Sequence, residues 1–327
     1  MTAEAKAWCR FVAIAASLAL AFALAVPQYL RRYAISRPSI VAIYSCFILL
    51  LIFVLAPAMC ASKRWIAAHI PTAAFVPIWI SPYLIYAAGT HDFRLDALLR
   101  ILLLAGPVTF IYRVFPVRNT CKFSWQDTAV GAWLMSAVLF HPLRGIWNVP
   151  TNLDFMMRLF VVTVGAWNWV FVRPVPCLGY EISSWKRVVK AATFNFACFA
   201  VIAIPFSLAM HFTAWNPRWH SFGAFCLDLL EIFVFVAWLE ELFFRGFLQN
   251  LLSNSLGSTW QGQLIASVLF GLSHIFHAPT PNWRYVALAS VAGWFYGAAY
   301  RSGSNLVASS LTHTLVDTAW RTWFSRL

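Results

Sequence analysis

Long apolar runs separated by short polar stretches dominate the pattern along this chain. Four of the runs contain no Asp, Glu, Lys or Arg, and they cover residues 11–30, 38–62, 65–90 and 191–217. Each is longer than the roughly 18 apolar residues that mark a helix able to cross a lipid bilayer. The pattern therefore predicts several transmembrane helices and excludes a soluble globular protein.

Shorter apolar runs lie between single arginines, at residues 101–112, 159–172 and 285–300. Arginine side chains near a helix end can extend to the lipid headgroups, so these segments can also span the membrane. With the remaining apolar segments, they predict an all-α, polytopic transmembrane helical bundle of about 8–11 spans.

The composition and charge agree with a membrane protein. Only 11% of the residues are charged, against about 25% in an average soluble domain. The formal net charge is +13, but basic residues such as Lys63, Arg64, Lys186 and Arg187 lie between apolar runs. This placement favours contact with anionic lipid headgroups over nucleic acid. We expect a multi-pass protein of a cell membrane, such as a bacterial inner membrane, with the bilayer and no nucleic acid as partner.

Ionisable residues within apolar surroundings concentrate in the C-terminal part. Residues 1–190 contain no grouping of side chains with an obvious chemistry, and we expect N-terminal transmembrane helices whose role the sequence does not define. Residues 191–327 contain several such groups. Ionisable side chains inside a membrane are costly and are usually functional. We therefore expect a second domain at 191–327 that contains the active-site helices.

The stretch WLEELFFRGF, residues 238–247, places two carboxylates and a guanidinium in an otherwise apolar helix. Glu241 and Arg245 are four positions apart, which brings them together on one helix face in the favourable order. Glu240 points about 100° away and has no partner nearby in the sequence. A buried carboxylate without a partner must be protonated or must meet a group from another helix.

Two later segments supply candidate partners. His274 follows Phe270 by four residues, within a stretch from 246 to 283 that lacks Asp, Glu, Lys and Arg. His313 and Asp317 lie four residues apart in SLTHTLVDTAW. Taken singly, each feature is more often structural, as an ion pair or a helix–helix hydrogen bond. A His–Asp pair is also compatible with a proton relay.

The three motifs EExxxR, FxxxH and HxxxD follow one another in this order over residues 240–317. In this they resemble the CPBP family, which comprises the type II CAAX prenyl proteases and the bacteriocin-processing, or Abi, enzymes. The resemblance covers roughly residues 192–324. Many members carry Asn where this chain has Asp317. The resemblance implies an intramembrane endopeptidase, a hydrolase that cleaves a membrane protein or lipidated peptide.

The resemblance also implies roles for the motif residues. The expected site residues are Glu240, Glu241, Arg245, His274, His313 and Asp317. Glu240 would be the general base, and His274 would help to hold the attacking water. His313 with Asp317 would stabilise the oxyanion. Asp317 can do so directly only if protonated; otherwise it would orient His313, whose other nitrogen would donate. The Glu241–Arg245 ion pair would fix the helix.

Two alternatives use the same residues. In one, Glu240, His274 and His313 ligate Zn²⁺ and leave a position for water. The chain lacks an HExxH motif and a CxxC pair, so we favour a mechanism without a metal or other cofactor. In the other, the protein is a proton-coupled transporter or a non-catalytic membrane scaffold of the same fold. A transporter often contains internal repeats, and none is visible in this sequence.

Overall fold

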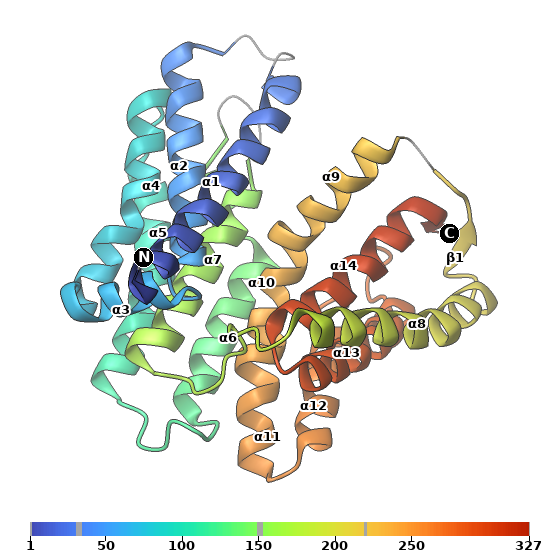
Figure 1. The fold of residues 1–327 in the computed structure, drawn as a ribbon. Coiled ribbons are helices and arrows are strands. Elements are labelled where there is room, and N and C mark those ends of the chain that lie inside the picture. The colour runs from blue at the N-terminus through green and yellow to red at the C-terminus, as the bar shows by residue number, and fades with distance from the viewer. Residues whose placement is uncertain (1, 31–34, 149–152, 219–220, 327) are drawn as a thin grey trace. The chain divides into compact units, whose positions relative to one another are not determined.

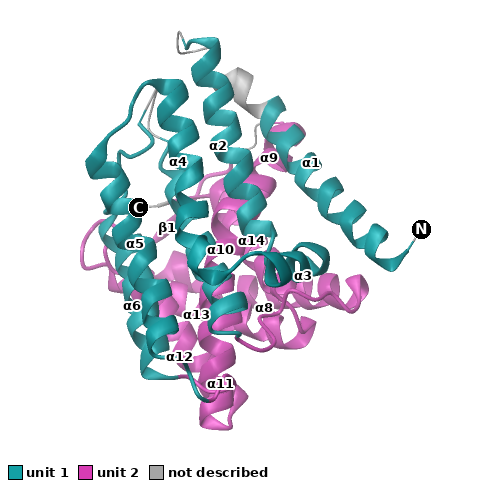
Figure 2. Cartoon of the chain, turned by 90° about the vertical axis from the view of Figure 1, so that its left-hand side faces the viewer, with its two compact units in different colours: residues 1–118, 124–174 teal, residues 119–123, 175–327 magenta. Residues whose placement is uncertain are grey.

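A computed structural model describes residues 2–30, 35–148, 153–218 and 221–326. The chain forms two compact units, coloured separately in Figure 2. Unit 1 comprises residues 1–118 and 124–174, and unit 2 comprises residues 119–123 and 175–327. The functional division at residue 190 expected from the sequence stays a prediction.

Unit 1 is helical. Its elements are α1 (Ala3–Leu30), α2 (Arg37–Leu55), α3 (Cys60–His69), η1 (Thr72–Ala74), α4 (Phe75–Thr90), α5 (Leu95–Val114), α6 (Trp125–Phe140), α7 (Phe155–Trp167) and the π-helical η2 (Asn168–Val172). Its core includes the fully buried indoles of Trp79 and Trp167, whose rings meet edge to face at 6.0 Å. The apolar run at 65–90 is broken near Pro71, between α3 and α4, because proline cannot continue the helix hydrogen-bond ladder.

Unit 1 contains a buried ion pair, Asp127–Arg173, that the sequence did not predict. Asp127 Oδ1 accepts hydrogen bonds from Arg173 Nε at 2.8 Å and from the Tyr112 hydroxyl at 3.0 Å. Asp127 Oδ2 accepts from Arg173 Nη2 at 2.9 Å and from the Ser124 backbone N–H at 2.9 Å. Both carboxylate oxygens are thus used by neighbouring donors, so the pair ties α5, α6 and the end of η2 together.

Unit 2 contains the three predicted motifs. Its elements are α8 (Trp185–Ala209), β1 (Thr213–Trp215), α9 (Phe222–Ile232), η3 (Phe233–Ala237), α10 (Trp238–Glu241), η4 (Leu242–Gln249), α11 (Asn250–Leu256), α12 (Thr259–Leu272), α13 (Trp283–Gly303), α14 (Leu306–Trp323) and β2 (Phe324–Arg326). Helices α8, α13 and α14 pack together, and α12 packs on α13 (Figure 1). Strands β1 and β2 pair antiparallel, with Ala214 opposite Ser325.

Capping side chains set where the motif helices begin. Ser258 caps α12, Asn282 caps α13 and Asn305 caps α14, each by accepting the backbone N–H three residues later. Such a cap satisfies one of the free N–H groups at the first helical turn. These caps mark the start of three helices around the predicted site: α12, which precedes His274, α13, and α14, which carries His313 and Asp317.

The predicted fold class is confirmed: the protein is an all-α, multi-pass membrane protein. Among the described residues, seven helical stretches are long and apolar enough to span: Ala3–Leu24, Arg37–Leu55, Thr72–Thr90, Leu95–Val114, Phe155–Val172, Trp185–Ala209 and Phe222–Leu256. This count is lower than the expected about 8–11. Helix α12 is too short to be counted as a span, with 14 residues. Helix α14 is not apolar enough, because it contains His313, Asp317 and Arg321.

Candidate active site

The two adjacent glutamates lie on one long helical stretch, from Phe222 to Leu256. The short α-helical α10 is flanked there by π-helical η3 and η4. A π-helix carries i→i+5 hydrogen bonds, is rare in proteins and frequently occurs at functional sites. It also changes the angle between successive side chains, so the faces that follow Leu242 depart from an ideal α-helix.

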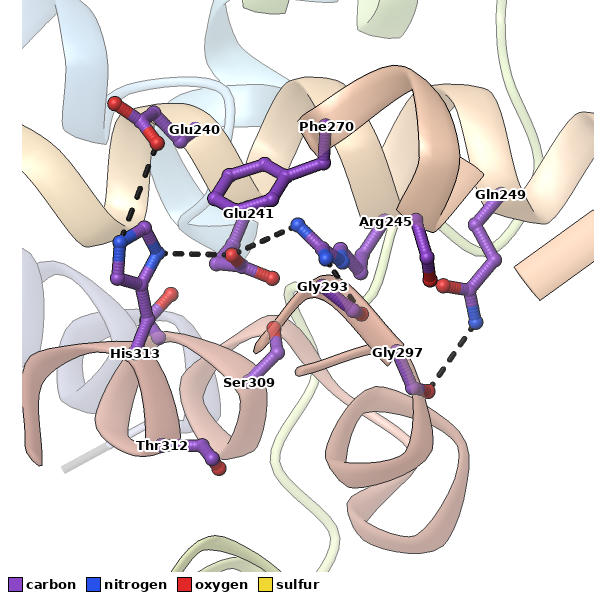
Figure 3. A network of polar contacts seen from close by, with 12 residues as sticks. Glu240, Glu241, Arg245, Gln249, Phe270, Gly293, Gly297, Ser309, Thr312 and His313 are labelled. Atoms are coloured by element: carbon purple, nitrogen blue, oxygen red, sulfur yellow. Dashed lines mark hydrogen bonds and ion pairs between the residues drawn. The ribbon is translucent and has the colours of Figure 1, made fainter. Parts of the chain in front are cut away.

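Glu241 and Arg245 form a fully buried ion pair. Arg245 Nη1 lies 3.0 Å from Glu241 Oε1, and both side chains are 0% exposed. The guanidinium also donates from Nη2 to the Gly293 carbonyl of α13 at 2.7 Å (Figure 3). The rings of Phe270 and Tyr296 face its Cζ at 4.8 and 5.3 Å. The pairing expected from the i, i+4 spacing is therefore present, and it links the helix to α13.

Gly293 makes this link possible. A Cβ at this position would lie 3.1 Å from Arg245 Nη2, 3.1 Å from the Phe270 ring and 3.2 Å from Ser267 Cα. These separations are shorter than the ordinary contact distance of about 3.5–4.0 Å between carbon atoms. Glycine therefore lets α13 approach the guanidinium, so that its carbonyl accepts the hydrogen bond without displacing these neighbours.

His313 of α14 lies between three carboxylates. Its Nδ1 is 3.0 Å from Glu241 Oε1, and its Nε2 is 4.0 Å from Glu240 Oε2 (Figure 3). The same Nε2 is 3.5 Å from Asp317 Oδ2. Both ring nitrogens face carboxylate oxygens, which can only accept hydrogen bonds when ionised. The geometry therefore favours the imidazolium form, with an N–H on each nitrogen.

This arrangement corrects one expectation. The sequence left open that Asp317 orients His313 while the other ring nitrogen donates to the substrate. In the structure the other nitrogen, Nδ1, is bonded to Glu241. Only Nε2, on the side of Glu240 and Asp317, remains to face a substrate. The sequence could not reveal this because Glu241 and His313 lie 72 residues apart.

The two glutamates differ in environment although they are neighbours in the chain. The Glu241 side chain is 0% exposed and bonded through Oε1 to both Arg245 and His313. The Glu240 side chain is 32% exposed, and that of Asp317 is 39% exposed. The Glu241 carboxylate is therefore shielded from solvent and held in an ion pair. The other can meet water and substrate while facing the same imidazole.

His274 lies just after α12 and is half-buried. Its Nδ1 is 2.8 Å from the Phe270 carbonyl oxygen and 3.1 Å from the Ser273 hydroxyl. The carbonyl can only accept, so Nδ1 is the donor in this contact, and Nε2 lies on the opposite side of the ring. Its ring lies 4.8 Å from that of Phe270, which in turn meets the His313 ring at 5.7 Å. The two histidines therefore share Phe270 as a neighbour.

Several groups around the site were not predicted. Tyr296 stacks on the His313 ring at 4.4 Å, and Gln249 donates from Nε2 to the Gly297 carbonyl at 3.2 Å. An aromatic residue and two glycines on an apolar helix carry no polar signal of their own. The spacing Gly293–Gly297 on α13 was the one available hint, since small residues four apart let membrane helices approach closely.

The three residues of the zinc alternative, Glu240, His274 and His313, do not converge on one point. No group of three His, Cys, Asp or Glu side chains in residues 2–30, 35–148, 153–218 and 221–326 is placed to hold a metal ion. His313 faces carboxylates with both nitrogens, which favours a protonated ring, whereas a metal ligand must be deprotonated. Glu240, His274 and His313 thus do not form a ready zinc site, and we derive no step through a metal.

Comparison with known proteins agrees with the motifs. Residues 222–319 match the family described as type II CAAX prenyl endopeptidase Rce1-like. The match contains all six predicted site residues and confirms the resemblance to the CAAX protease family. It supports a CAAX-type intramembrane endopeptidase that acts on a peptide or protein in the membrane, and it leaves residues 1–221 outside. No curated protein and no solved structure matches the chain.

Proposed function

We propose that residues 191–327 form an intramembrane endopeptidase in which Glu240 is the general base that activates water. One observation carries the proposal: the adjacent carboxylates of Glu240 and Glu241 both face the His313 imidazole, and of these two only Glu240 is exposed to solvent. Glu241 is sealed by Arg245 and His313, whereas Glu240 is 32% exposed and 4.0 Å from His313 Nε2. A general base must reach a water beside the substrate. The Glu240 side chain is open to water, whereas the Glu241 side chain is 0% exposed.

In the proposed reaction, Glu240 takes a proton from a water molecule as the water oxygen bonds to the peptide carbonyl carbon. His274 holds that water, because its Nε2 lone pair can accept a hydrogen bond while Nδ1 is occupied by the Phe270 carbonyl. The C–N bond then breaks, and the protonated Glu240 delivers its proton to the departing nitrogen. One water is consumed, and an acid and an amine are formed.

The negative oxygen that forms on the carbonyl needs a donor nearby. His313 Nε2 lies between Glu240 and Asp317, and its N–H is the donor on that side of the ring. The bond from Nδ1 to Glu241 sets the ring direction and keeps the positive charge on the imidazole. Such preorganised donors are a large source of rate acceleration in acyl transfer. Asp317 contributes by holding this N–H, or as a second donor when protonated.

The substrate we propose is a membrane protein or a lipidated peptide. A proton-coupled transporter or a non-catalytic scaffold could also contain ionisable groups on neighbouring helices. In a relay, however, protons must pass along the groups, whereas Glu241 is fully buried and its Oε1 is bonded to both Arg245 and His313. This favours a positioning role for Glu241 over a place in a proton relay.

The proposal is tested by quantitative proteomics of membrane fractions from cells that produce the wild-type protein, Glu240→Ala or Glu231→Ala. Glu231 is a matched control because it is an exposed glutamate on the same helical stretch, in an ion pair with Arg321. We expect at least one membrane-associated protein to lose a specific cleavage with Glu240→Ala alone. Equal cleavage patterns in all three, at equal levels of inserted protein, would reject the proposed function.

A further inference from the structure

The Tyr296 ring stacks on the imidazole ring of His313. It lies on α13, is 1% exposed, and stacks on the imidazole with a centroid distance of 4.4 Å and an interplanar angle of 16°. Phe270 meets the same imidazole edge to face, at 5.7 Å and 90°. The Tyr296 ring thus covers one face of the His313 imidazole, and the Phe270 ring packs perpendicular to it.

The stacking supplies a constraint that hydrogen bonds do not. The Nδ1–Glu241 bond fixes one point of the imidazole, but the ring could still pivot about that bond. Rotation of the ring out of its present plane would drive its edge into the Tyr296 face. Tyr296 therefore fixes the plane of the ring, and with it the direction of Nε2 toward Glu240 and Asp317.

Tyr296 is itself held by its backbone and by charge. Three residues before it, the Gly293 carbonyl accepts from Arg245, and one residue after it, the Gly297 carbonyl accepts from Gln249. Arg245 Cζ also lies 5.3 Å from the Tyr296 ring centroid, a favourable arrangement for a cation over an aromatic face. The ring thus belongs to a rigid part of α13 that is tied to the helix of the two glutamates.

We propose that Tyr296 is a positioning residue: its ring holds the His313 imidazole in the plane that points Nε2 at the reacting groups. The aromatic face does this, and the hydroxyl is not required. The consequence for catalysis rests on the proposed endopeptidase function. The consequence for the ring of His313 does not, so the two can fail separately.

The spectroscopic test is NMR on full-length protein with ¹⁵N-labelled histidine in detergent micelles. The His313 signals are those that disappear from the spectrum of His313→Gln. In wild type and Tyr296→Phe we expect the same His313 ring-nitrogen shifts. In Tyr296→Leu we expect shifted or exchange-broadened signals, because the imidazole can then pivot. Tyr296→Met is a second variant that fills the space flexibly without a planar face. Unchanged His313 signals in Leu or Met would overturn the proposal, as would Phe behaving like Leu.

The kinetic test uses the substrate that the membrane proteomics identifies. We expect kcat to fall roughly threefold to tenfold in Tyr296→Leu or Tyr296→Met with KM nearly unchanged, which is the energy scale of one aromatic pair. Tyr296→Phe keeps the aromatic ring and should have the kcat of wild type. Phe199→Leu is the control, because Phe199 is a buried aromatic of α8 that packs on Phe295. An equal loss in Phe199→Leu would reveal a general packing effect and overturn the positioning role. If Glu240→Ala leaves cleavage intact, the proposed function fails while the spectroscopic result still decides the role of Tyr296.

Discussion

His313 Nδ1 and Glu241 Oε1 are joined by a 3.0 Å hydrogen bond that connects α14 to α10 across 72 residues of sequence. The same Glu241 oxygen also receives Arg245 at 3.0 Å. One sealed carboxylate therefore fixes both a guanidinium and an imidazole. In the proposed mechanism, Glu241 positions these two groups and Glu240 is the carboxylate that reacts.

We expect Glu240→Gln to remove peptide cleavage. Glutamine keeps the volume of the side chain but cannot accept the proton of water, and loss of a general base costs about 10²–10⁴ in rate. The measurement is the cleavage rate with purified, folded protein in micelles or vesicles. Glu231→Gln is the control and should cleave normally, because Glu231 lies at the exposed Arg321 ion pair. Near-normal cleavage by Glu240→Gln would refute its role as base.

The Glu241–Arg245 pair should behave as a thermodynamic unit. Removing one partner leaves a buried charge, which lowers the free energy of unfolding by about 3–5 kcal/mol. Glu241→Ala should be the more severe change because it also strips His313 of its Nδ1 partner. Thermal unfolding of both single variants and the double variant, in the same detergent, gives the coupling energy.

The matched control is the half-exposed pair Asp228–Arg321, at 2.9 Å. Exposed ion pairs contribute about 0–1 kcal/mol, so the same cycle there should show weak coupling. A Glu241–Arg245 coupling no larger than that of Asp228–Arg321 would contradict the view that the buried pair holds the site together.

The sequence predicted the membrane class and the Glu241–Arg245 pair because both depend on local patterns. Apolar runs report bilayer helices directly, and i, i+4 spacing brings two side chains together within one helix. It missed what depends on tertiary contacts. Examples are the hydrogen bond from His313 to Glu241, the stacking of Tyr296, and the Asp127–Arg173 pair of unit 1. It also gave no sign of the π-helical turns at η3 and η4, since hydrophobic periodicity does not separate them from an α-helix.

Gly293→Ala should destabilise the site without removing any functional group. Its methyl would lie 3.1 Å from Arg245 Nη2 and from the Phe270 ring, and overpacking of this kind costs about 1–3 kcal/mol. We expect a lower unfolding temperature and slower cleavage. Gly223→Ala on α9 is the control, since the nearest atom to its methyl is 4.0 Å away. It should be neutral or stabilising by up to about 1 kcal/mol. Equal stability of Gly293→Ala and wild type would show that α13 can move away freely.

Metal removal separates the two hydrolytic mechanisms. If Glu240 and His274 activate water directly, protein stripped with a strong chelator should keep its cleavage rate. If zinc is a ligated cofactor, purified protein should contain about one metal ion per chain, and stripping should abolish cleavage until zinc is restored. We expect the first outcome. Metal analysis and cleavage assays on the same stripped sample decide the point, with Glu240→Gln as the inactive reference.

Asp317→Asn tests how the oxyanion is stabilised. Asp317 Oδ2 lies 3.5 Å from His313 Nε2, and His313 Nδ1 is already bonded to Glu241. An asparagine can turn its carbonyl toward Nε2–H and still offer its amide N–H₂ to the substrate, and its charge does not depend on pH. We therefore expect cleavage to be retained, with less loss of rate as the pH rises if a protonated Asp317 is the natural donor. The measurement is the cleavage rate across pH, with Asp228→Asn as the control at the exposed ion pair. A loss of about 10³-fold or more, in folded protein, equals the removal of an essential oxyanion-stabilising group. That result would mean the carboxylate itself is required, and the assignment of His313 Nε2 and residue 317 as joint donors would be wrong.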